Sequence, residues 1–464
     1  MEIAKRDRDP IVDLVRNVIN THFEDLPEEI VTFEKKRVLD NIGTLFAGSH
    51  AAGVETLIDF VKESSGKKES TILAHGGQVT CQDAAFVNSV MARAIDYCDV
   101  VDPGYHPSST DIPTAFAVGE MMGSSGKDVI TALAAGGDLA LRINAGGAYP
   151  ISEQNPYYGF DSNVVAVFGS AAIAGKLLDL NEEQMVHAMG IAFNQACGSF
   201  QSNIDGSIAV KVIQGSATRS GIVSAILAKK GITGAKNVLF GPFGWFQLYT
   251  RGKCNQEILM SQLGDKYYGP EYLIFKKYPC CTGNIPMVAA ILDLVLEYDI
   301  RPEDVEGIGV RLDNMMYTLL GKPFAPGENP EVDAVFSARY NGANALLRRS
   351  SKLIHYTKPL ILEPGVLSLT NKINLVPDKN FHLLETMVNI RLKNGKEYSL
   401  HTQNTKGWPQ NPLSKDELEA KFRDCMNFTS TKLGIEKVET IIEIVNHLET
   451  LKDLSDLIKI LVHN

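Results

Sequence analysis

The sequence predicts a mainly α protein, in which both chain ends form one all-α helical bundle and a smaller α+β domain is inserted between them. Apolar residues recur at helical spacing through most of the first half of the chain. After about Tyr268 the pattern changes to alternating runs and a hairpin turn, and it becomes helical again after about residue 412. We therefore expect residues 1–267 and 408–464 to form the helical domain and residues 268–407 to form the α+β domain.

The expected helices of the first half follow one another along the chain. Residues 26–48 place Ile30 and Leu45 near one face, and Gly48 follows as a helix stop. Later runs are rich in Ala and Gly, which lets helices pack closely, and Asp138 inside one of them argues against a membrane span. These later helices are expected at residues 128–147, 162–180, 181–198 and 211–231.

The α+β domain is indicated by alternation and by one turn. Residues 305–313 alternate as a strand does, and residues 384–402 form two alternating runs around Asn394–Gly395. Asn-Gly between such runs indicates a hairpin because both residues tolerate positive φ. Helical patterns lie at 287–298 and 334–349. Ser414 and Glu417 then have capping-box spacing, and the amphipathic tail 450–461 is expected to pack back on the first domain.

Composition excludes several classes of function. The net charge of −10, with no basic block, argues against nucleic-acid binding. Seven cysteines without CxxC pairs indicate a reducing compartment, and the charged N-terminus lacks a signal-peptide core, so we predict a cytoplasmic protein that does not enter a membrane. The familiar nucleotide, P-loop, zinc-protease and hydrolase motifs are missing, so no cofactor is expected.

One loop draws attention to a histidine. The stretch DYCDVVDPGYHPSSTDIP (96–113) joins two apolar helical runs, and Pro103, Gly104 and Pro107 exclude a continuous helix through it. His106 therefore lies on a loop held by packed elements, where binding groups are often mounted. On composition alone, a polar surface loop with one solvated histidine is the favoured interpretation. Its aspartates recur every third residue, but calcium loops need a more regular ligand series, so we expect no metal site.

Other candidate residues each have an ordinary structural alternative. Lys211 lies in apolar SIAVKVIQG, where a lysine needs an anion, suffers a lowered pKa or reaches out from a helix end. Tyr340 in FSARYNGANAL is either a site residue or a core tyrosine whose hydroxyl is satisfied. YPCCTGNIP (278–286) carries two thiols, and free cysteines are more often small buried apolar residues than nucleophiles. Residues 149–163 form a further loop able to line a pocket. An imidazole, an ammonium, a phenol and several carboxylates brought together would suit acid–base chemistry on an anionic carbon acid.

Several ordered motifs resemble one family. HPSSTDIPTAFAVGE, GSAAIAGKLLDLNEEQMVHAMGIAFNQACG, KVIQGSATRSG, YPCCTGNIPMVAA and VFSARYNGANAL follow in the order found in the MmgE/PrpD family, which includes 2-methylcitrate dehydratase, cis-aconitate decarboxylase and iminodisuccinate epimerase. The resemblance covers nearly the whole chain. It implies an all-α domain from both chain ends, a smaller α+β lid domain, a homodimer, and an active site between the domains that uses no cofactor.

The resemblance also implies roles for individual residues. His106 matches the catalytic histidine of the HPS loop, and Asp96 matches an acidic residue upstream of it. Lys211 lies at, or one residue from, the substrate-binding lysine. Tyr340 matches a tyrosine of the lid domain near the substrate. The expected catalytic set is therefore His106, Lys211 and Tyr340.

Departures from the family pattern concern the substrate-binding positions. Dehydratases and decarboxylases of the family usually carry a histidine at the position of Asp161 and another at Ile285, four residues after Cys281 of the YPxC motif. Val100 replaces a site threonine. An aspartate repels a substrate carboxylate unless it is protonated or paired, and isoleucine transfers no proton. We therefore expect a substrate with fewer negative charges or a more apolar pocket, and neither a standard 2-methylcitrate dehydratase nor a standard cis-aconitate decarboxylase.

The resulting hypothesis is a lyase of the dehydratase type or an isomerase that acts on a small carboxylate. Proton abstraction next to a carboxylate or carbonyl group would be followed by elimination, or by reprotonation as in an iminodisuccinate-type epimerase. His106 or Lys211 would be the base, and Tyr340 would act as acid or orient the substrate. The alternative from another class is a non-catalytic relative that binds a metabolite.

Overall fold

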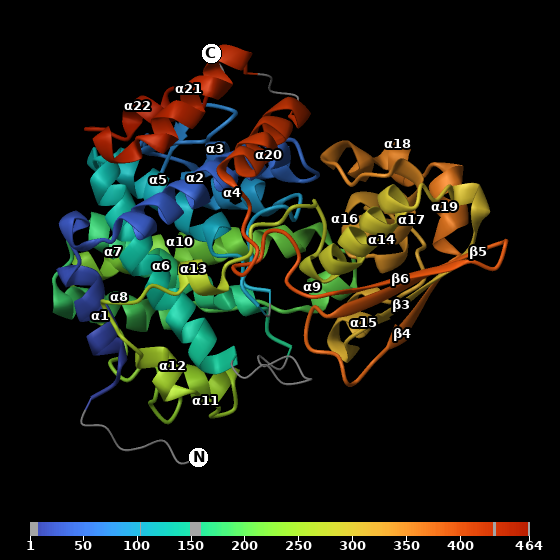
Figure 1. The fold of residues 1–464 in the computed structure, drawn as a ribbon. Coiled ribbons are helices and arrows are strands. Elements are labelled where there is room, and N and C mark those ends of the chain that lie inside the picture. Colours follow the sequence, from blue (N-terminus) through green and yellow to red (C-terminus); the bar gives the residue numbers. More distant parts are fainter. Residues whose placement is uncertain (1–7, 103, 149–158, 430–432, 463–464) are drawn as a thin grey trace.

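The computed structural model describes residues 8–102, 104–148, 159–429 and 433–462. The protein is mainly helical, as the sequence predicts, and its buried apolar side chains form two large cores. The larger core takes residues from Ile11 to Phe275 and again from Leu413 to Leu461. The smaller core takes residues from Ile274 to Trp408, together with Val100. We call the parts around these cores the helical domain and the lid domain; they lie side by side in Figure 1.

The helical domain is a bundle in which helices from both chain ends pack together (Figure 1). Its helices are α1 (Ile11–Asn20), α2 (Glu28–Gly48), α3 (Val54–Ser64), α4 (Cys81–Arg93), α5 (Ser108–Met122), α6 (Gly126–Ala148), α7 (Ala166–Leu177), α8 (Glu182–Phe193), α9 (Gln201–Ile204), α10 (Val212–Lys229), α11 (Trp245–Tyr249), α12 (Gln256–Met260), α13 (Gly269–Tyr272), α20 (Lys415–Phe428), α21 (Ile435–Asn446) and α22 (Ser455–Ile458). Short strands β1 (Ser70–Thr71) and β2 (Gln78–Val79) pair antiparallel beside them.

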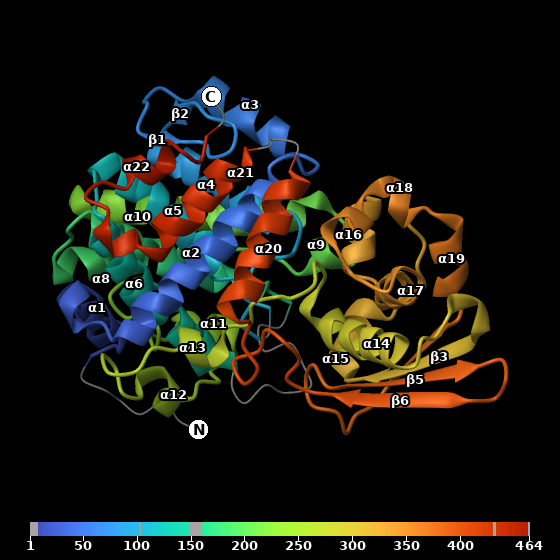
Figure 2. The same ribbon diagram turned by 45° about the horizontal axis from the view of Figure 1, so that its top comes forward.

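The lid domain is a four-stranded sheet with helices packed on one face (Figure 2). Its strands β3 (Val305–Leu312), β4 (Ile373–Pro377), β5 (Thr386–Leu392) and β6 (Glu397–Thr402) lie in the order β4-β3-β5-β6, and only the β3–β4 pair is parallel. The expected hairpin joins β5 to β6, with Gly395 at φ 83°. Its helices are α14 (Ile285–Glu297), α15 (Asn314–Leu320), α16 (Pro330–Val335), α17 (Ala338–Arg348), α18 (Lys358–Ile361) and α19 (Pro364–Thr370).

Short 3₁₀ helices complete the backbone and hold several site residues. They are η1 (Phe23–Asp25), η2 (Ser162–Val165), η3 (Ile208–Lys211), η4 (Thr282–Asn284), η5 (Pro302–Asp304), η6 (Leu353–Tyr356) and η7 (Leu448–Thr450). Within the described residues, no helix combines the length and the apolar character that crossing a bilayer requires.

Local capping chemistry explains where some elements start. The capping box expected at Ser414 and Glu417 is present, and its two hydrogen bonds begin α20. The single helix expected over residues 334–349 is wrong, because the chain breaks at Phe336 and Ser337 and forms α16 and α17 instead. The Ser337 hydroxyl accepts a hydrogen bond from the Tyr340 backbone N–H and caps the second helix.

The C-terminal segment returns to the first helices of the chain. Helix α20 lies along α2, where Gly43 leaves room for the Phe422 ring. The Lys421 ammonium lies 2.7 Å from the Asp40 carboxylate in the same contact. The tail packs on the larger core as expected, through Leu454, Leu457 and Leu461 among others, although only residues 455–458 of it are α-helical.

Candidate active site

The candidate site is centred on the loop between α4 and α5. The segment that leads into the lid domain pairs with this loop. Helix α4 ends at Arg93, and three residues later Asp96 has a left-handed backbone conformation, with φ 52°, through which a helix cannot continue. Val100 then exchanges two backbone hydrogen bonds with Ile274, of 3.1 and 2.8 Å. The loop thus forms a short antiparallel bridge with the segment that leads into the lid domain.

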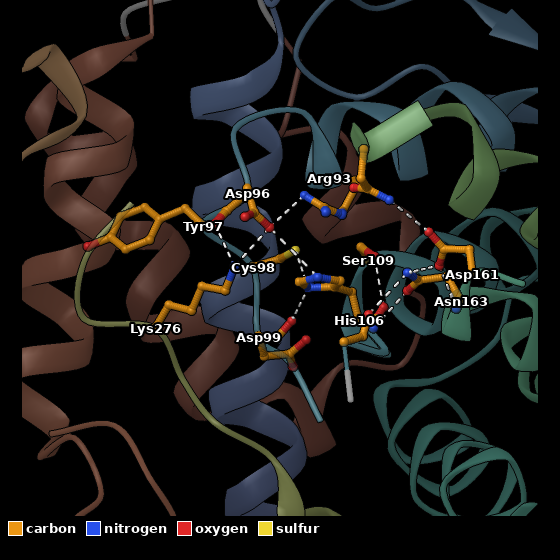
Figure 3. A network of polar contacts seen from close by, with 12 residues as sticks. Arg93, Asp96, Tyr97, Cys98, Asp99, His106, Ser109, Asp161, Asn163 and Lys276 are labelled. Atoms are coloured by element: carbon orange, nitrogen blue, oxygen red, sulfur yellow. Dashed lines mark hydrogen bonds and ion pairs between the residues drawn. The ribbon is translucent and has the colours of Figure 1, made fainter. Parts of the chain in front are cut away.

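His106 is buried at the end of this loop rather than solvated on the surface. Only 5% of it is exposed. Its Nδ1 lies 2.7 Å from the Asp99 backbone oxygen, and because a carbonyl can only accept, Nδ1 carries the proton (Figure 3). Burial, followed by the nearby Arg93 and Lys276 cations, holds the pKa of His106 well below its usual value. The imidazole is therefore neutral near pH 7, and Nε2 has a lone pair available.

Asp96 lies at the centre of the charged groups around His106 (Figure 3). Its Oδ1 lies 2.7 Å from an Arg93 Nη1, 2.8 Å from the Lys276 ammonium and 3.7 Å from the His106 Nε2. Burial opposes ionisation, but the charges of Arg93 and Lys276 outweigh it and lower the pKa of Asp96 to about 2. The ionised Asp96 and the two cations leave one net positive charge beside His106.

A buried network behind the loop fixes the backbone that holds His106. The Ser108 backbone N–H donates to the Asp99 carboxylate at 3.1 Å, and the Ser108 hydroxyl donates to the same group. Arg37 Nε donates to the Ser108 hydroxyl at 2.9 Å and its guanidinium pairs with Asp111 at 2.5 Å. Burial of Asp99 raises its pKa to about 6. These contacts set the position of the Asp99 carbonyl that orients the imidazole.

Asn163 of η2 holds the loop from the other side. Its side-chain oxygen accepts the His106 backbone N–H at 2.8 Å, and its amide group donates to the Gly104 carbonyl at 3.1 Å. The same amide group donates to Asp161 at 2.6 Å. Burial raises the pKa of Asp161, while bonds from Asn163 partly offset that effect. Asp161 is thus paired with amide groups rather than with a cation (Figure 3).

His106 faces a small cavity between the two domains, with a volume of about 60 Å³. Four other predicted positions reach it, namely Asp96, Val100, Asp161 and Cys281. Burial raises the pKa of the Cys281 thiol to about 11, so Cys281 is a neutral wall residue.

Lys211 lines a second, larger cavity of about 350 Å³ that shares Arg93, Asp96 and Phe336 with the first. The structure therefore places Lys211 in a cavity next to that of His106, on the other side of the residues that both cavities share. Burial lowers the pKa of Lys211 to about 8, with a further lowering by Arg93. Among the described residues its ammonium has no hydrogen-bond or ion-pair partner in the protein.

Two predicted site residues lie elsewhere. Tyr340 is fully buried in the lid core between the rings of Phe324 and Tyr356, its hydroxyl donates to the His355 carbonyl, and it lines neither cavity. This placement does not support the expected contact of Tyr340 with the substrate, because its side chain packs in the lid core. Ile285 is also fully buried in the lid core and lines neither cavity, so its position does not support the expected contact with substrate either.

The site contains three residues that the sequence did not single out. Arg93 and Lys276 pair with Asp96, and Asn163 clamps the loop. Lys276 lies in apolar YLIFKKYP, the same signal that pointed to Lys211. Asp102 also lines the His106 cavity, and burial, with repulsion from Asp313, raises its pKa to about 7.

Residues 149–158 of the loop expected at 149–163 lie outside the described residues. Within the described chain, no group of three histidine, cysteine or carboxylate side chains is arranged to hold a metal ion.

Comparison with known proteins identifies matches over almost the whole chain. The MmgE/PrpD N-terminal domain model matches residues 12–257, and the MmgE/PrpD C-terminal domain model matches residues 278–450. Cis-aconitate decarboxylase from Homo sapiens is 27% identical over 457 residues, which cover 94% of this chain and 91% of that protein. The enzyme of the same name from Mus musculus is 26% identical, with 94% and 90% covered, and that from Aspergillus terreus is 24% identical, with 95% and 94% covered.

Proposed function

This chain belongs to the MmgE/PrpD family, and we propose that it is a cofactor-independent lyase or isomerase acting on a small carboxylate. The reaction begins with removal of a proton from a carbon next to a carboxylate or carbonyl group. The observation that carries this proposal is the neutral, buried His106, whose Nδ1–H bond to Asp99 leaves Nε2 unprotonated beside two cations.

The charges around His106 suit both stages of proton abstraction. When Nε2 takes the proton, the imidazolium that forms lies near the Asp96 carboxylate, 3.7 Å away. The negative charge that develops on the activating group of the substrate is stabilised by Arg93, Lys211 and Lys276, which line the two cavities. These groups are buried and held in place, so little reorganisation is needed during the reaction.

Elimination and epimerisation differ in the fate of the proton. In elimination, the His106 imidazolium returns the proton to the departing hydroxyl group, water leaves and a carbon–carbon double bond forms. In epimerisation, a second acid protonates the carbanion on its other face. Tyr340 lines neither cavity, and its hydroxyl donates to the His355 carbonyl, so its position does not favour it for that role. We propose the Asp102 carboxyl group, whose raised pKa of about 7 keeps part of it protonated at neutral pH, for that role.

We propose that the substrate differs from cis-aconitate, which carries three carboxylates. Asp102 and Asp161 both line the His106 cavity. At the position of Asp161, the family pattern predicts a histidine. Each acidic side chain disfavours a further substrate carboxylate nearby. A substrate with one or two carboxylates satisfies Lys211 and Arg93 without meeting both aspartates.

Proton exchange in D2O, followed by NMR, tests the proposal. The purified protein is incubated with a panel of hydroxy-, imino- and unsaturated mono- and dicarboxylates, with cis-aconitate and 2-methylcitrate included. We expect loss of an α- or β-proton signal from a panel member and no turnover of the last two compounds. The His106→Asn variant, run in parallel, should show no exchange.

The other outcomes separate the alternatives. A new olefinic signal identifies a lyase, whereas exchange without one identifies an epimerase. Binding in a thermal-shift assay without exchange on the whole panel would overturn the catalytic proposal in favour of a metabolite-binding relative. The homodimer expected from the family resemblance stays a proposal, which light scattering of the purified protein tests.

A further inference from the structure

The larger cavity has a largely apolar wall, which has no role in the proton abstraction proposed above. Most of its wall is apolar, and both domains contribute, as with Ala47, Ala51, Ile95 and Ile208 from the helical domain and Val332 and Leu353 from the lid domain. Its volume of about 350 Å³ lies within the range of small-molecule sites. We call this space the apolar chamber. Its two walls are brought together only when the domains are docked.

The lining of the chamber includes Arg93, Asp96, Lys211 and Glu331 among its charged side chains. Arg93 and Asp96 form the wall shared with the His106 cavity, and Lys211 lies on the 3₁₀ helix η3 that forms part of the chamber wall. Asp96 is already neutralised by Arg93 and Lys276. Glu331, by contrast, is exposed, so it marks the rim of the chamber. A ligand inside therefore meets an unpaired ammonium next to apolar surface.

Resting on the proposed function, we propose that the substrate is a carboxylate with an apolar substituent, and that this substituent occupies the apolar chamber. The carboxylate lies at Lys211 and Arg93. The reacting carbon then lies across the shared wall, toward Asp96 and His106. An aliphatic or small cyclic group extends the other way, between Ala51 and Leu353.

A compact polyanion fits this arrangement poorly. Its additional carboxylates would be desolvated against the alanine, isoleucine and leucine side chains of the chamber, which carry no hydrogen-bond donors to replace water. An apolar group in the same place instead removes its own surface and that of the wall from water, at a gain of about 25 cal/mol per Å². The chamber thus selects for an amphiphilic acid.

Binding of straight-chain carboxylates tests the chamber directly. Acetate, butanoate, hexanoate and octanoate are titrated into the full-length protein and followed by calorimetry. We expect the affinity to rise about fourfold per added methylene group, the factor that corresponds to burial of that group, until the chamber is full. Affinities that stay equal from acetate to octanoate would overturn the proposal.

Four variants, one of them a control, locate the effect. Ala51→Phe fills the chamber and should reduce the gain from acetate to octanoate to less than tenfold, whereas Ala420→Phe, on the exposed face of α20, should retain the full gain. Lys211→Met should weaken every acid by the same factor and leave the dependence on chain length intact. Leu353→Ala enlarges the chamber and should extend the rise in affinity to decanoate.

The results also separate this proposal from the catalytic one. A dependence on chain length that is unchanged in both Ala51→Phe and Leu353→Ala places the alkyl chain elsewhere and overturns the chamber. If exchange in D2O still occurs with short dicarboxylates, the proposed function stands without it. A chain-length dependence that responds to both variants supports the chamber even if no acid of the panel exchanges a proton.

Discussion

At the scale of single residues, the tautomer and position of His106 are set by hydrogen bonds to neighbouring groups. The Asp99 carbonyl selects the tautomer, and the Asn163 amide oxygen holds the His106 backbone N–H. A substitution at this buried position must therefore avoid opening a void. Alanine would remove packing as well as the imidazole, so asparagine, which can still donate to the Asp99 carbonyl, is the better replacement.

We predict that His106→Asn lowers kcat for the substrate identified by exchange about 10²- to 10⁴-fold, the usual contribution of a general base. The thermal unfolding midpoint should change by only a few degrees. Tyr340→Phe is the control, since its hydroxyl bonds to the His355 carbonyl in the lid core. That variant should lose about 1 kcal/mol of stability and retain its turnover. Loss of activity in Tyr340→Phe would instead show that the Tyr340 hydroxyl takes part in the reaction.

The lowered pKa of Lys211 leads us to predict that kcat/KM depends on pH. With a pKa of about 8 it loses its charge as the pH rises through 8, so kcat/KM should fall about tenfold per pH unit above that point. In Lys211→Arg the guanidinium stays charged and the decline near pH 8 should disappear. An identical decline in both enzymes would assign it to another group.

Unfolding does not explain that decline. Between pH 8 and the ordinary lysine pKa, the unfolded chain binds a proton at Lys211 that the folded chain does not. The free energy of unfolding contributed by this residue therefore rises with pH in that window. Denaturant titrations at pH 7 and pH 9 measure this term separately from activity.

At the scale of elements, close packing of α2 on α20 joins the two ends of the chain. A Cβ at Gly43 would lie 3.1 Å from the Phe422 ring and 3.4 Å from the Cys425 Cβ. The same contact is reinforced by Lys421 and Asp40. The small side of α2 is thus matched to the large aromatic side chain of α20.

We predict that Gly43→Leu destabilises the protein by about 1–3 kcal/mol, because the added atoms overpack this contact. Adding Phe422→Ala to the same chain should recover part of that loss, since the space vacated by the ring accommodates leucine. Urea unfolding of the single and double variants measures the coupling. Strictly additive effects would mean that the two helices do not share this contact in solution.

At the scale of the whole molecule, the two large cores differ in how the chain builds them. The larger one needs both chain ends, whereas the smaller one is built almost entirely from one continuous segment. The two connections between the domains lie together, because the Phe275 backbone N–H donates to the Gly407 carbonyl at 3.0 Å. A short linker can therefore replace the lid domain.

We predict opposite results for two deletions. Replacing residues 278–405 with a short Gly-Ser linker should leave a folded helical protein without exchange activity, since the lid walls of both cavities are lost. Ending the chain at residue 407 should give an unfolded or aggregated product, because α20 and α21 no longer cover α2. Circular dichroism and gel filtration distinguish the outcomes. A soluble, cooperatively folded product of the second deletion would show that the larger core does not need the C-terminal segment.

Much of the fold could be predicted because local chemistry determines it. Helical spacing located the long helices, the Asn394–Gly395 turn located the hairpin and Ser414 with Glu417 located the start of α20. The break between α16 and α17 was missed, because the serine cap at Ser337 competes with an otherwise continuous helical pattern.

The sequence by itself determined the family, the mainly helical class and the loop that carries His106, since ordered motifs and residue spacing contain that information. Only the tertiary structure decided which side chains meet. It brought Lys276 to Asp96 from 180 residues further along the chain, beside the nearby Arg93, and placed Tyr340 and Ile285 in the lid core. The physical reason is that burial and charge pairing depend on distances between remote segments, and only the docking of the two domains sets those distances.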